Sequence, residues 1–180
     1  EATTGITFFS AWAATLSYTF QIYFDFSGYT DMALGSARLF NIKLPANFNT
    51  PYRAGNLQDF WRRWHMTLSR WLRDYVYIPL GGNRRGPART YVNLVATFFL
   101  GGLWHGAGWT FLVWGLLHGI GTSFHKLWTA GGFRLGPLSG WLSTFVFVNV
   151  AWVFFRAVDL GHAVDVIRAL IGMGEALPSR

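Results

Sequence analysis

The stretch TYVNLVATFFLGGLWHGAGWTFLVWGLLHGIGTSFH (90–125) runs for 36 residues without Lys, Arg, Asp or Glu, yet it holds His105, His118 and His125. One straight helix of that length would measure about 54 Å, whereas a hydrocarbon core is only about 30 Å thick. The glycine cluster at 101–108 interrupts the stretch near its middle. We therefore expect a broken helix pair within 90–124, with helices over 90–103 and 109–124.

The depth of this break in the membrane makes His105 a candidate functional residue. A helix over 90–103 would be only about 21 Å long, so the break is expected inside the membrane. Irregular backbone at that depth is tolerated only where protein or a water-filled cavity surrounds it. His105 is therefore expected on a cavity wall, where a neutral imidazole can take a proton from a hydroxyl. The alternative is a packing histidine bonded to a carbonyl.

Two further apolar segments are long enough to cross a membrane. Residues 6–24 (ITFFSAWAATLSYTFQIYF) carry no charge, and residues 138–155 (LSGWLSTFVFVNVAWVFF) end at Arg156. Charged residues make up 13% of the chain, against about 25% in soluble proteins, while hydrophobic residues make up 52%. These features predict an all-α, polytopic transmembrane protein with about four membrane-embedded helices, rather than a soluble or disordered chain.

The positive charge of the chain is concentrated in residues 38–89. This segment holds ten basic and two acidic residues, a net charge of +8, while the rest of the chain sums to −1. A basic block can bind nucleic acid. Here it lies between apolar segments, so we interpret it as a cytoplasmic and interfacial segment facing an anionic membrane surface, with no nucleic-acid partner.

Within the basic segment, residues 56–77 have the pattern of one amphipathic helix in the interface. Asn56 can cap its start, and His65 lies on its aromatic stripe. His65 is either a functional residue or an interfacial residue like the neighbouring Trp61 and Trp64. The arginines on the opposite face either set topology and contact lipid headgroups, or attract a phosphate-bearing donor such as a coenzyme A thioester.

The other ionisable residues carry weaker signals. His118 lies beside Gly115 and Gly119, which favours a role in close helix packing. We assign no function to the interfacial His125 and His162.

The run 24–31 (FDFSGYTD) is expected to end the first span. Ser27 or Thr30 would cap a following helix, with Asp31 at its positive end. Alternatively, Asp25 or Asp31 orients a histidine or arginine at the cavity.

Several classes of chemistry are disfavoured. The chain has no cysteine, which excludes a thiol nucleophile and cysteine-bound zinc. No carboxylate lies between Arg89 and Lys126, so no metal site is expected from the histidines. No GxxxxGK[ST] or GxSxG pattern is present, which counts against an ATPase or an α/β-hydrolase.

Three long motifs resemble the membrane-bound O-acyltransferase (MBOAT) family. They are YFDFSGYTDMALG (23–35), NFNTPYRAGNLQDFWRRWHMTLSRWLRDYVYIPLGGNRRG (47–86) and GGLWHGAGWTFLVWGLLHG (101–119). Within that family they are similar to the membrane subunits of bacterial alginate O-acetyltransferases. The resemblance implies that residues 1–180 are a fragment of a larger multi-pass domain in the bacterial inner membrane.

The same resemblance implies a function and a site. A cytoplasmic thioester, acetyl-CoA or a similar donor, would supply an acetyl group to a hydroxyl acceptor through a tunnel across the membrane, with no permanently bound cofactor. The family's invariant histidine falls on His105 and its second motif histidine on His65, so these are the expected catalytic residues. The expected partners are membrane lipids, the acyl donor, periplasmic acetyl-transfer proteins and an alginate-like exopolysaccharide.

Two alternatives to alginate-like O-acetylation stay open. One is transfer of D-alanyl or acetyl groups to teichoic acid or peptidoglycan. The other is a non-catalytic membrane scaffold or transporter component, because broken helices with intramembrane histidines also occur in transporters.

Overall fold

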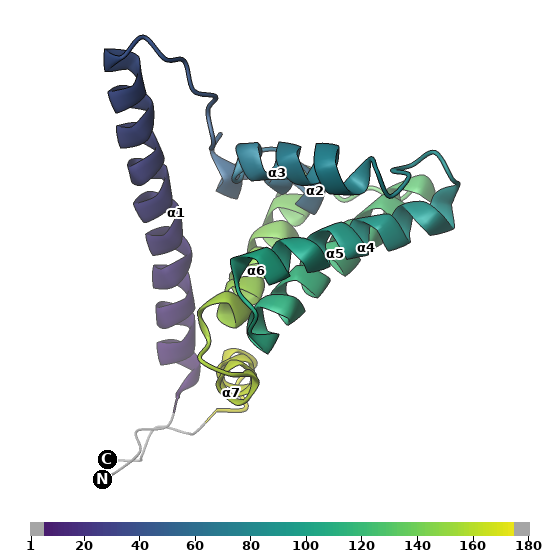
Figure 1. The fold of residues 1–180 in the computed structure, drawn as a ribbon. Helices are drawn as coiled ribbons and strands as arrows, with labels where there is room; N and C mark the ends of the chain where they lie inside the picture. Colours follow the sequence, from purple (N-terminus) through teal and green to yellow (C-terminus); the bar gives the residue numbers. More distant parts are fainter. Residues whose placement is uncertain (1–5, 175–180) are drawn as a thin grey trace.

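The computed structural model describes residues 6–174, and all regular elements within that range are helical (Figure 1). The predicted all-α class is therefore confirmed. The longer helices are α1 (Phe8–Leu39), α4 (Pro87–His105), α5 (Trp109–Ala130), α6 (Pro137–Arg156) and α7 (Leu160–Leu170). The shorter elements are the 3-10 turn η1 (Pro51–Arg53), α2 (Leu57–Trp61), α3 (Met66–Leu72) and the π-helical turn η2 (Arg73–Tyr77).

Helix α1 is longer than predicted. It continues for 32 residues, about 48 Å, through the run that was expected to end the first span. The hydroxyls expected to cap a following helix instead bond back within α1: Ser27 Oγ donates to the Phe24 carbonyl at 3.4 Å, and Thr30 Oγ1 to the Phe26 carbonyl at 2.8 Å. The capping prediction is wrong because the helix supplies local acceptors for both hydroxyls.

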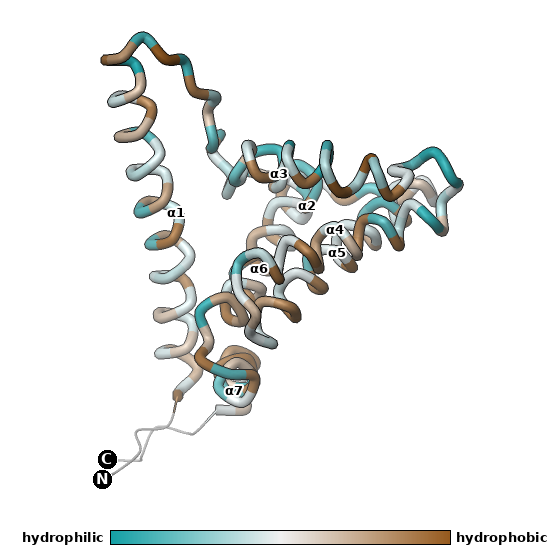
Figure 2. The backbone as a smooth tube through the Cα atoms, in the orientation of Figure 1, coloured by the Kyte–Doolittle hydropathy of each residue, from teal (hydrophilic) through white to brown (hydrophobic). Residues whose placement is uncertain are grey.

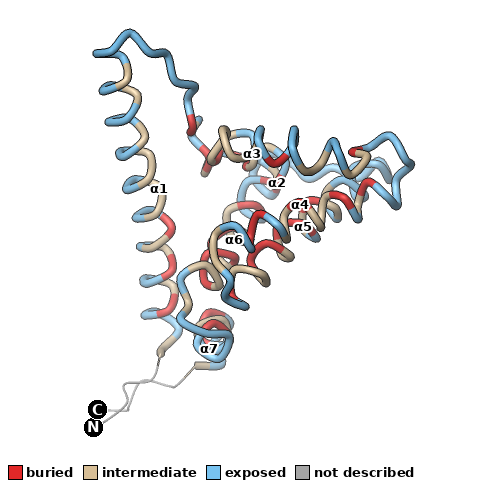
Figure 3. The backbone as a smooth tube through the Cα atoms, viewed as in Figure 1, coloured by how far each residue is buried: buried red, intermediate tan, exposed pale blue. Residues whose placement is uncertain are grey.

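The first half of α1 packs against α6 and α7, whereas its second half stands largely exposed (Figure 3), although Phe26 still contacts Phe48 and His65. Two polar contacts fix the packed half. Trp12 Nε1 donates to the Leu170 carbonyl of α7 at 3.0 Å, and Asn149 Nδ2 of α6 donates to Thr19 Oγ1 at 2.8 Å. Thr19 and Asn149 are both fully buried, so this bond lies inside the helix interface.

The prediction of a single amphipathic helix over 56–77 is wrong, although the predicted start at Asn56 is correct. Asn56 Oδ1 accepts the Asp59 backbone N–H at 2.8 Å and caps α2. The chain then leaves the helix after Trp61 and resumes as α3 at Met66. The interruption centres on His65, whose φ of 42° and ψ of 53° are left-handed. His65 therefore lies at a helix junction instead of on a helix face.

Helices α4 and α5 form an antiparallel hairpin whose break is shorter than predicted. Only residues 106–108 leave the helix. Glycines serve close packing here: a Cβ on Gly102 would lie 2.4 Å from the Phe111 carbonyl oxygen, and one on Gly115 would lie 2.4 Å from that of Phe98. Since α4 measures about 28 Å rather than 21 Å, helix length no longer places the break at mid-membrane depth.

Helix α6 matches the segment predicted over 138–155. It has 20 residues, its most apolar 18-residue stretch has a mean hydropathy of 1.6, and it is long and apolar enough to cross a membrane. Among the helices of residues 6–174 it alone meets that criterion, so the predicted count of about four membrane-embedded helices is not confirmed. Hydrophilic residues are frequent around α2, α3 and the loop before α4 (Figure 2).

An aromatic core joins α2, α5 and α6. Phe60 and Trp64 pack from the α2 side, Trp114 from α5 and Trp152 from α6, and all four are buried. The Trp114 and Trp152 rings are stacked, with centroids 5.8 Å apart. Trp114 also contacts His105, and Trp64 directly precedes His65 in the chain, so the core is the frame on which the site is built.

Candidate functional site

His105 is the last residue of α4, and three aromatic rings surround its imidazole. Trp104, Trp114 and Phe155 meet it edge to face, with centroids 4.9, 5.2 and 5.1 Å away. The side chain is half-buried. No described residue hydrogen-bonds to either ring nitrogen, so the alternative of a carbonyl-bonded packing histidine is not seen within residues 6–174. The rings fix the imidazole plane while its nitrogens stay available.

His65 is held by polar contacts. Its Nδ1 lies 3.1 Å from Asn47 Oδ1 and 3.4 Å from Thr67 Oγ1, and the Phe26 ring meets the imidazole at a centroid distance of 4.8 Å. Burial, and secondarily the positive charge that His105 would carry, lowers the pKa of His65 to about 4. His65 is therefore neutral at physiological pH.

The fold brings the two histidines into one region. A positive charge on His105 contributes, after burial, to the lowered pKa of His65. The aromatic core links them: Trp64, next to His65 in the chain, packs on Trp152 at 5.0 Å, and Trp152 packs on Phe155 at 5.3 Å. Phe155 is the ring that covers His105.

The left-handed backbone of His65 costs roughly 1–2 kcal/mol for a residue with a Cβ. Two backbone hydrogen bonds hold it in place. The Met66 N–H donates to the Asn47 carbonyl at 2.9 Å, and the Asn49 N–H donates to the Arg63 carbonyl at 2.9 Å. The irregular segment before η1 therefore pairs with the turn on both sides of His65 and fixes its direction.

His118 is a packing residue, as predicted. It is 0% exposed, and its Nδ1 accepts the Trp61 Nε1–H at 3.2 Å. Phe60, Trp114 and aromatic neighbours from α4 and α6 surround the ring. The bond from Trp61 ties α2 to α5 inside the core, and His118 takes no part in the candidate site.

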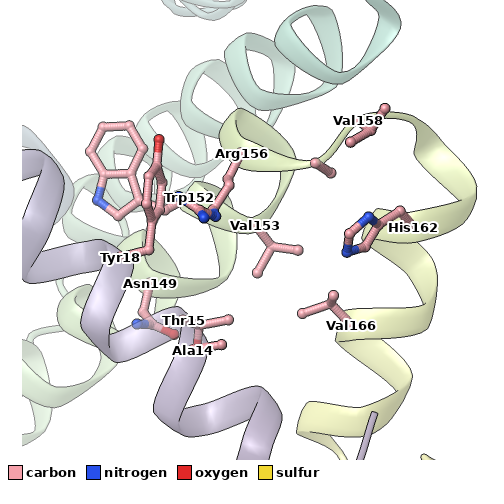
Figure 4. A pocket seen from close by; sticks show the side chains of 11 residues that line it. Ala14, Thr15, Tyr18, Asn149, Trp152, Val153, Arg156, Val158, His162 and Val166 are labelled. Atoms are coloured by element: carbon pink, nitrogen blue, oxygen red, sulfur yellow. The ribbon is translucent and has the colours of Figure 1, made fainter. Parts of the chain in front are cut away.

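A cavity of about 400 Å³ lies between α1, α6 and α7 (Figure 4). Tyr18, Trp152, Arg156 and His162 are among its lining residues, and the Arg156 guanidinium lies 4.8 Å from the centre of the Tyr18 ring. His105 is not among them, so this cavity does not correspond to the one predicted beside His105. Trp152 lines it and packs on Phe155, which in turn contacts His105.

The remaining residues singled out from the sequence form no hydrogen bond with either candidate histidine in the described part of the chain. Asp25 and Asp31 are exposed on the second half of α1, and neither forms an ion pair with a described residue. Neither caps a helix, because α1 continues past both. His162 is exposed near the start of α7, and His125 is half-buried in α5.

The residues that support the two histidines were not recognised from the sequence. Asn47 holds His65 from an irregular segment, where no hydrophobic periodicity marks a position. Its place at the start of the second motif was the one available signal. Phe155 and Trp114 cover His105 from two other helices, and they were recognised only as parts of apolar spans.

The comparison with known families decides the classification. Residues 3–158 match the membrane-bound O-acyltransferase family, MBOAT. The chain belongs to this family. It is accordingly a membrane protein, and its motif histidines, His65 and His105, are linked through one aromatic core.

Named relatives share this sequence closely. The chain is 54% identical over 177 residues to the peptidoglycan O-acetyltransferase of Helicobacter pylori, covering 96% of this chain and 34% of that protein. It is 46% identical over 173 residues to the probable alginate O-acetylase AlgI of Pseudomonas aeruginosa, covering 91% and 32%.

A more distant match is the teichoic acid D-alanyltransferase of Bacillus subtilis, 40% identical over 96 residues, which covers 49% of this chain and 24% of that protein. The chain therefore spans about a third of the length of the O-acetylating relatives it matches.

Proposed function

We propose that the whole protein is a multi-pass acetyltransferase of the bacterial inner membrane, acting on a hydroxyl group of an extracytoplasmic polysaccharide. The observation that supports this most strongly is the imidazole of His105. Aromatic rings from three helices orient it, its nitrogens have no partner among the described residues, and the aromatic core links it to the second motif histidine. Acyltransferase chemistry is also what the named relatives have in common.

His105 acts as the general base in this proposal. It takes the proton of the acceptor hydroxyl while the hydroxyl oxygen attacks the carbonyl carbon of the thioester. A carbon–oxygen bond forms, the carbon–sulfur bond breaks, and the proton held by the imidazole passes to the departing thiolate. The products are an acetyl ester and a free thiol. His65, neutral at physiological pH, positions the donor or the acceptor.

The donor is acetyl-CoA or a similar cytoplasmic thioester, and no cofactor stays bound between turnovers. The exposed arginines Arg84, Arg85 and Arg89, in and beside the loop before α4, supply positive charge that suits a phosphate-bearing donor. Periplasmic acetyl-transfer proteins are the partners expected to carry the group to the polysaccharide.

Two acceptors are candidates. An alginate-like exopolysaccharide agrees with the several alginate O-acetylases at 45–47% identity. Peptidoglycan is favoured by the higher identity, 54%, to a peptidoglycan O-acetyltransferase. Transfer of D-alanine is less well supported, because that relative aligns with only about half of the chain.

The test is acetyl transfer by the whole protein in membranes, with labelled acetyl-CoA, the partner proteins and either purified alginate or purified peptidoglycan. His105→Ala should lower the transfer rate by about 100-fold to 10,000-fold while membrane insertion is unchanged. His125→Ala is the matched control and should keep full activity. Full activity in His105→Ala would refute the assignment, and no acylated product from the unsubstituted protein would favour a scaffold or transporter component.

A further inference from the structure

The environment of Asn47 decides which of its side-chain atoms faces His65. Asn47 is 7% exposed, and its Oδ1 lies 3.2 Å from the Thr67 backbone nitrogen. A backbone N–H can only donate a hydrogen bond, so the amide atom that faces it has to be the oxygen. The Thr67 hydroxyl, 2.8 Å away, donates to the same oxygen.

The orientation of the Asn47 amide in turn decides the proton of His65. The same Oδ1 lies 3.1 Å from His65 Nδ1. An oxygen can only accept, so Nδ1 carries the hydrogen and donates it. In the other neutral form, the lone pair of Nδ1 would face the lone pairs of Oδ1, and the Thr67 hydroxyl at 3.4 Å could satisfy Nδ1 only by giving up its shorter bond to Asn47.

We propose that Asn47 is a positioning residue that keeps His65 in the Nδ1–H form, so that His65 offers a bare Nε2 to the substrate. A bare nitrogen accepts hydrogen bonds. It therefore binds an O–H or N–H group, such as the hydroxyl of the acceptor or an amide of the thioester arm, and it does not bind the thioester carbonyl oxygen. The substrate part of this inference rests on the proposed acetyl transfer, whereas the proton assignment does not.

The arrangement is built before any substrate arrives. Backbone bonds from Asn47 and Asn49 clamp the turn on both sides of His65, and the Phe26 ring limits rotation of the imidazole. Three donors converge on one buried amide oxygen. A histidine that needed only to fill space would not require a fixed proton.

The first experiment reads the proton directly. Nitrogen-15 NMR of histidine-labelled whole protein in lipid nanodiscs distinguishes a protonated ring nitrogen from a bare one. His65 should show a protonated Nδ1 and a bare Nε2 in the unsubstituted protein, in Asn47→Asp and in the control Thr67→Val, which keeps the backbone N–H. Asn47→Leu should lose this pattern. A protonated Nε2 in the unsubstituted protein would overturn the proposal.

The second experiment measures acetyl transfer in the same variants. Asn47→Leu should lower kcat/KM by about tenfold or more, as for other residues that orient a histidine. Asn47→Asp should keep most of the unsubstituted kcat/KM, because a carboxylate also accepts a hydrogen bond from Nδ1–H. A raised KM for the acceptor assigns the bound group to the hydroxyl, and a raised KM for the thioester assigns it to the donor. An unchanged KM for both contradicts substrate binding by His65. If no acetyl transfer is found at all, the NMR result still decides the proton assignment.

Discussion

The two motif histidines are held by opposite means. His65 is fixed by hydrogen bonds at the junction between α2 and α3, with its Nδ1 paired to a buried amide. His105 is fixed by three aromatic edges, and both of its nitrogens are without a partner among the described residues. A paired ring nitrogen settles the position of its proton, whereas an unpaired one leaves the proton free to move.

This difference assigns different tasks to the two residues. A histidine that must take and return a proton within one reaction needs a ring nitrogen that is not hydrogen-bonded to a neighbouring residue. A residue that must recognise one polar group gains from a fixed donor and acceptor pattern. The arrangement therefore favours His105 for proton transfer and His65 for binding, and the following changes test that division from the largest expected effect to the smallest.

Gly102→Val should have the largest effect on stability. Its side chain would collide with the Phe111 carbonyl oxygen, forcing α4 away from α5 and displacing His105 at the end of α4. We expect a loss of about 3 kcal/mol or more in unfolding free energy, since an overpacked helix contact cannot relax easily. Gly28→Ala is the control, because a Cβ there meets nothing within 4 Å. Thermal unfolding in detergent checks both, and equal stability of the two variants would contradict the packing role.

Phe155→Ala should have the second-largest effect. The change removes one of the three rings around His105 and leaves the imidazole free to tilt. Acetyl transfer should fall by about tenfold, equivalent to about 1.4 kcal/mol, because small misplacements of a base are costly. Phe124→Ala, at an exposed position of α5, is the control and should keep its activity. Equal rates in the two variants would show that the rings do not position His105.

The pH dependence of the unfolding temperature should reveal how the lowered pKa of His65 contributes to stability. Its pKa is about 4 in the folded protein and about 6.5 in an unfolded chain, so between these values the unfolded state binds more protons. The stabilisation is fully present above about pH 6.5 and is lost as the pH falls towards 4. Unfolding temperatures measured across this range should drop less in His65→Gln than in the unsubstituted protein. Parallel curves for the two proteins would rule out His65 as a contributor.

Asp74→Asn should have the smallest effect. Asp74 accepts from Arg73 Nε at 2.7 Å, but both side chains are about half-exposed. Exposed ion pairs of this kind contribute little, because solvent screens them and both side chains lose freedom. We expect no measurable change in unfolding temperature or in acetyl transfer. A clear loss of activity would mean that this exposed pair has a part in the reaction.

Apolar periodicity predicted the helices well in segments where no distant contact alters the local backbone. The segment 138–155 became α6, and the charge-free stretch became a hairpin with His105 at its turn. Asn56 was recognised as a cap because the bond it makes is local. His118 was recognised as a packing residue from the glycines beside it, whose absent side chains permit close approach.

The failures all arose where distant residues decide the local structure. His65 fits an amphipathic helix by spacing, yet bonds from Asn47 and Asn49 hold its backbone in a left-handed conformation that spacing cannot reveal. Gly101 and Gly102 look like helix breakers until their partners are present, which are Leu72 of α3 for Gly101 and the backbone of α5 for Gly102. Ser27 and Thr30 look like caps, but the same hydroxyls are equally satisfied inside a continuing helix.

The bond between Trp12 and the Leu170 carbonyl has a consequence for biosynthesis. Its two partners lie 158 positions apart in the chain. At synthesis rates of about 5–20 residues per second, α1 leaves the ribosome roughly 8–30 s before the helix that completes its packing. For that interval the face of α1 that packs on α7 lacks this neighbour, so lipid, an insertion factor or another part of the protein has to shield it meanwhile.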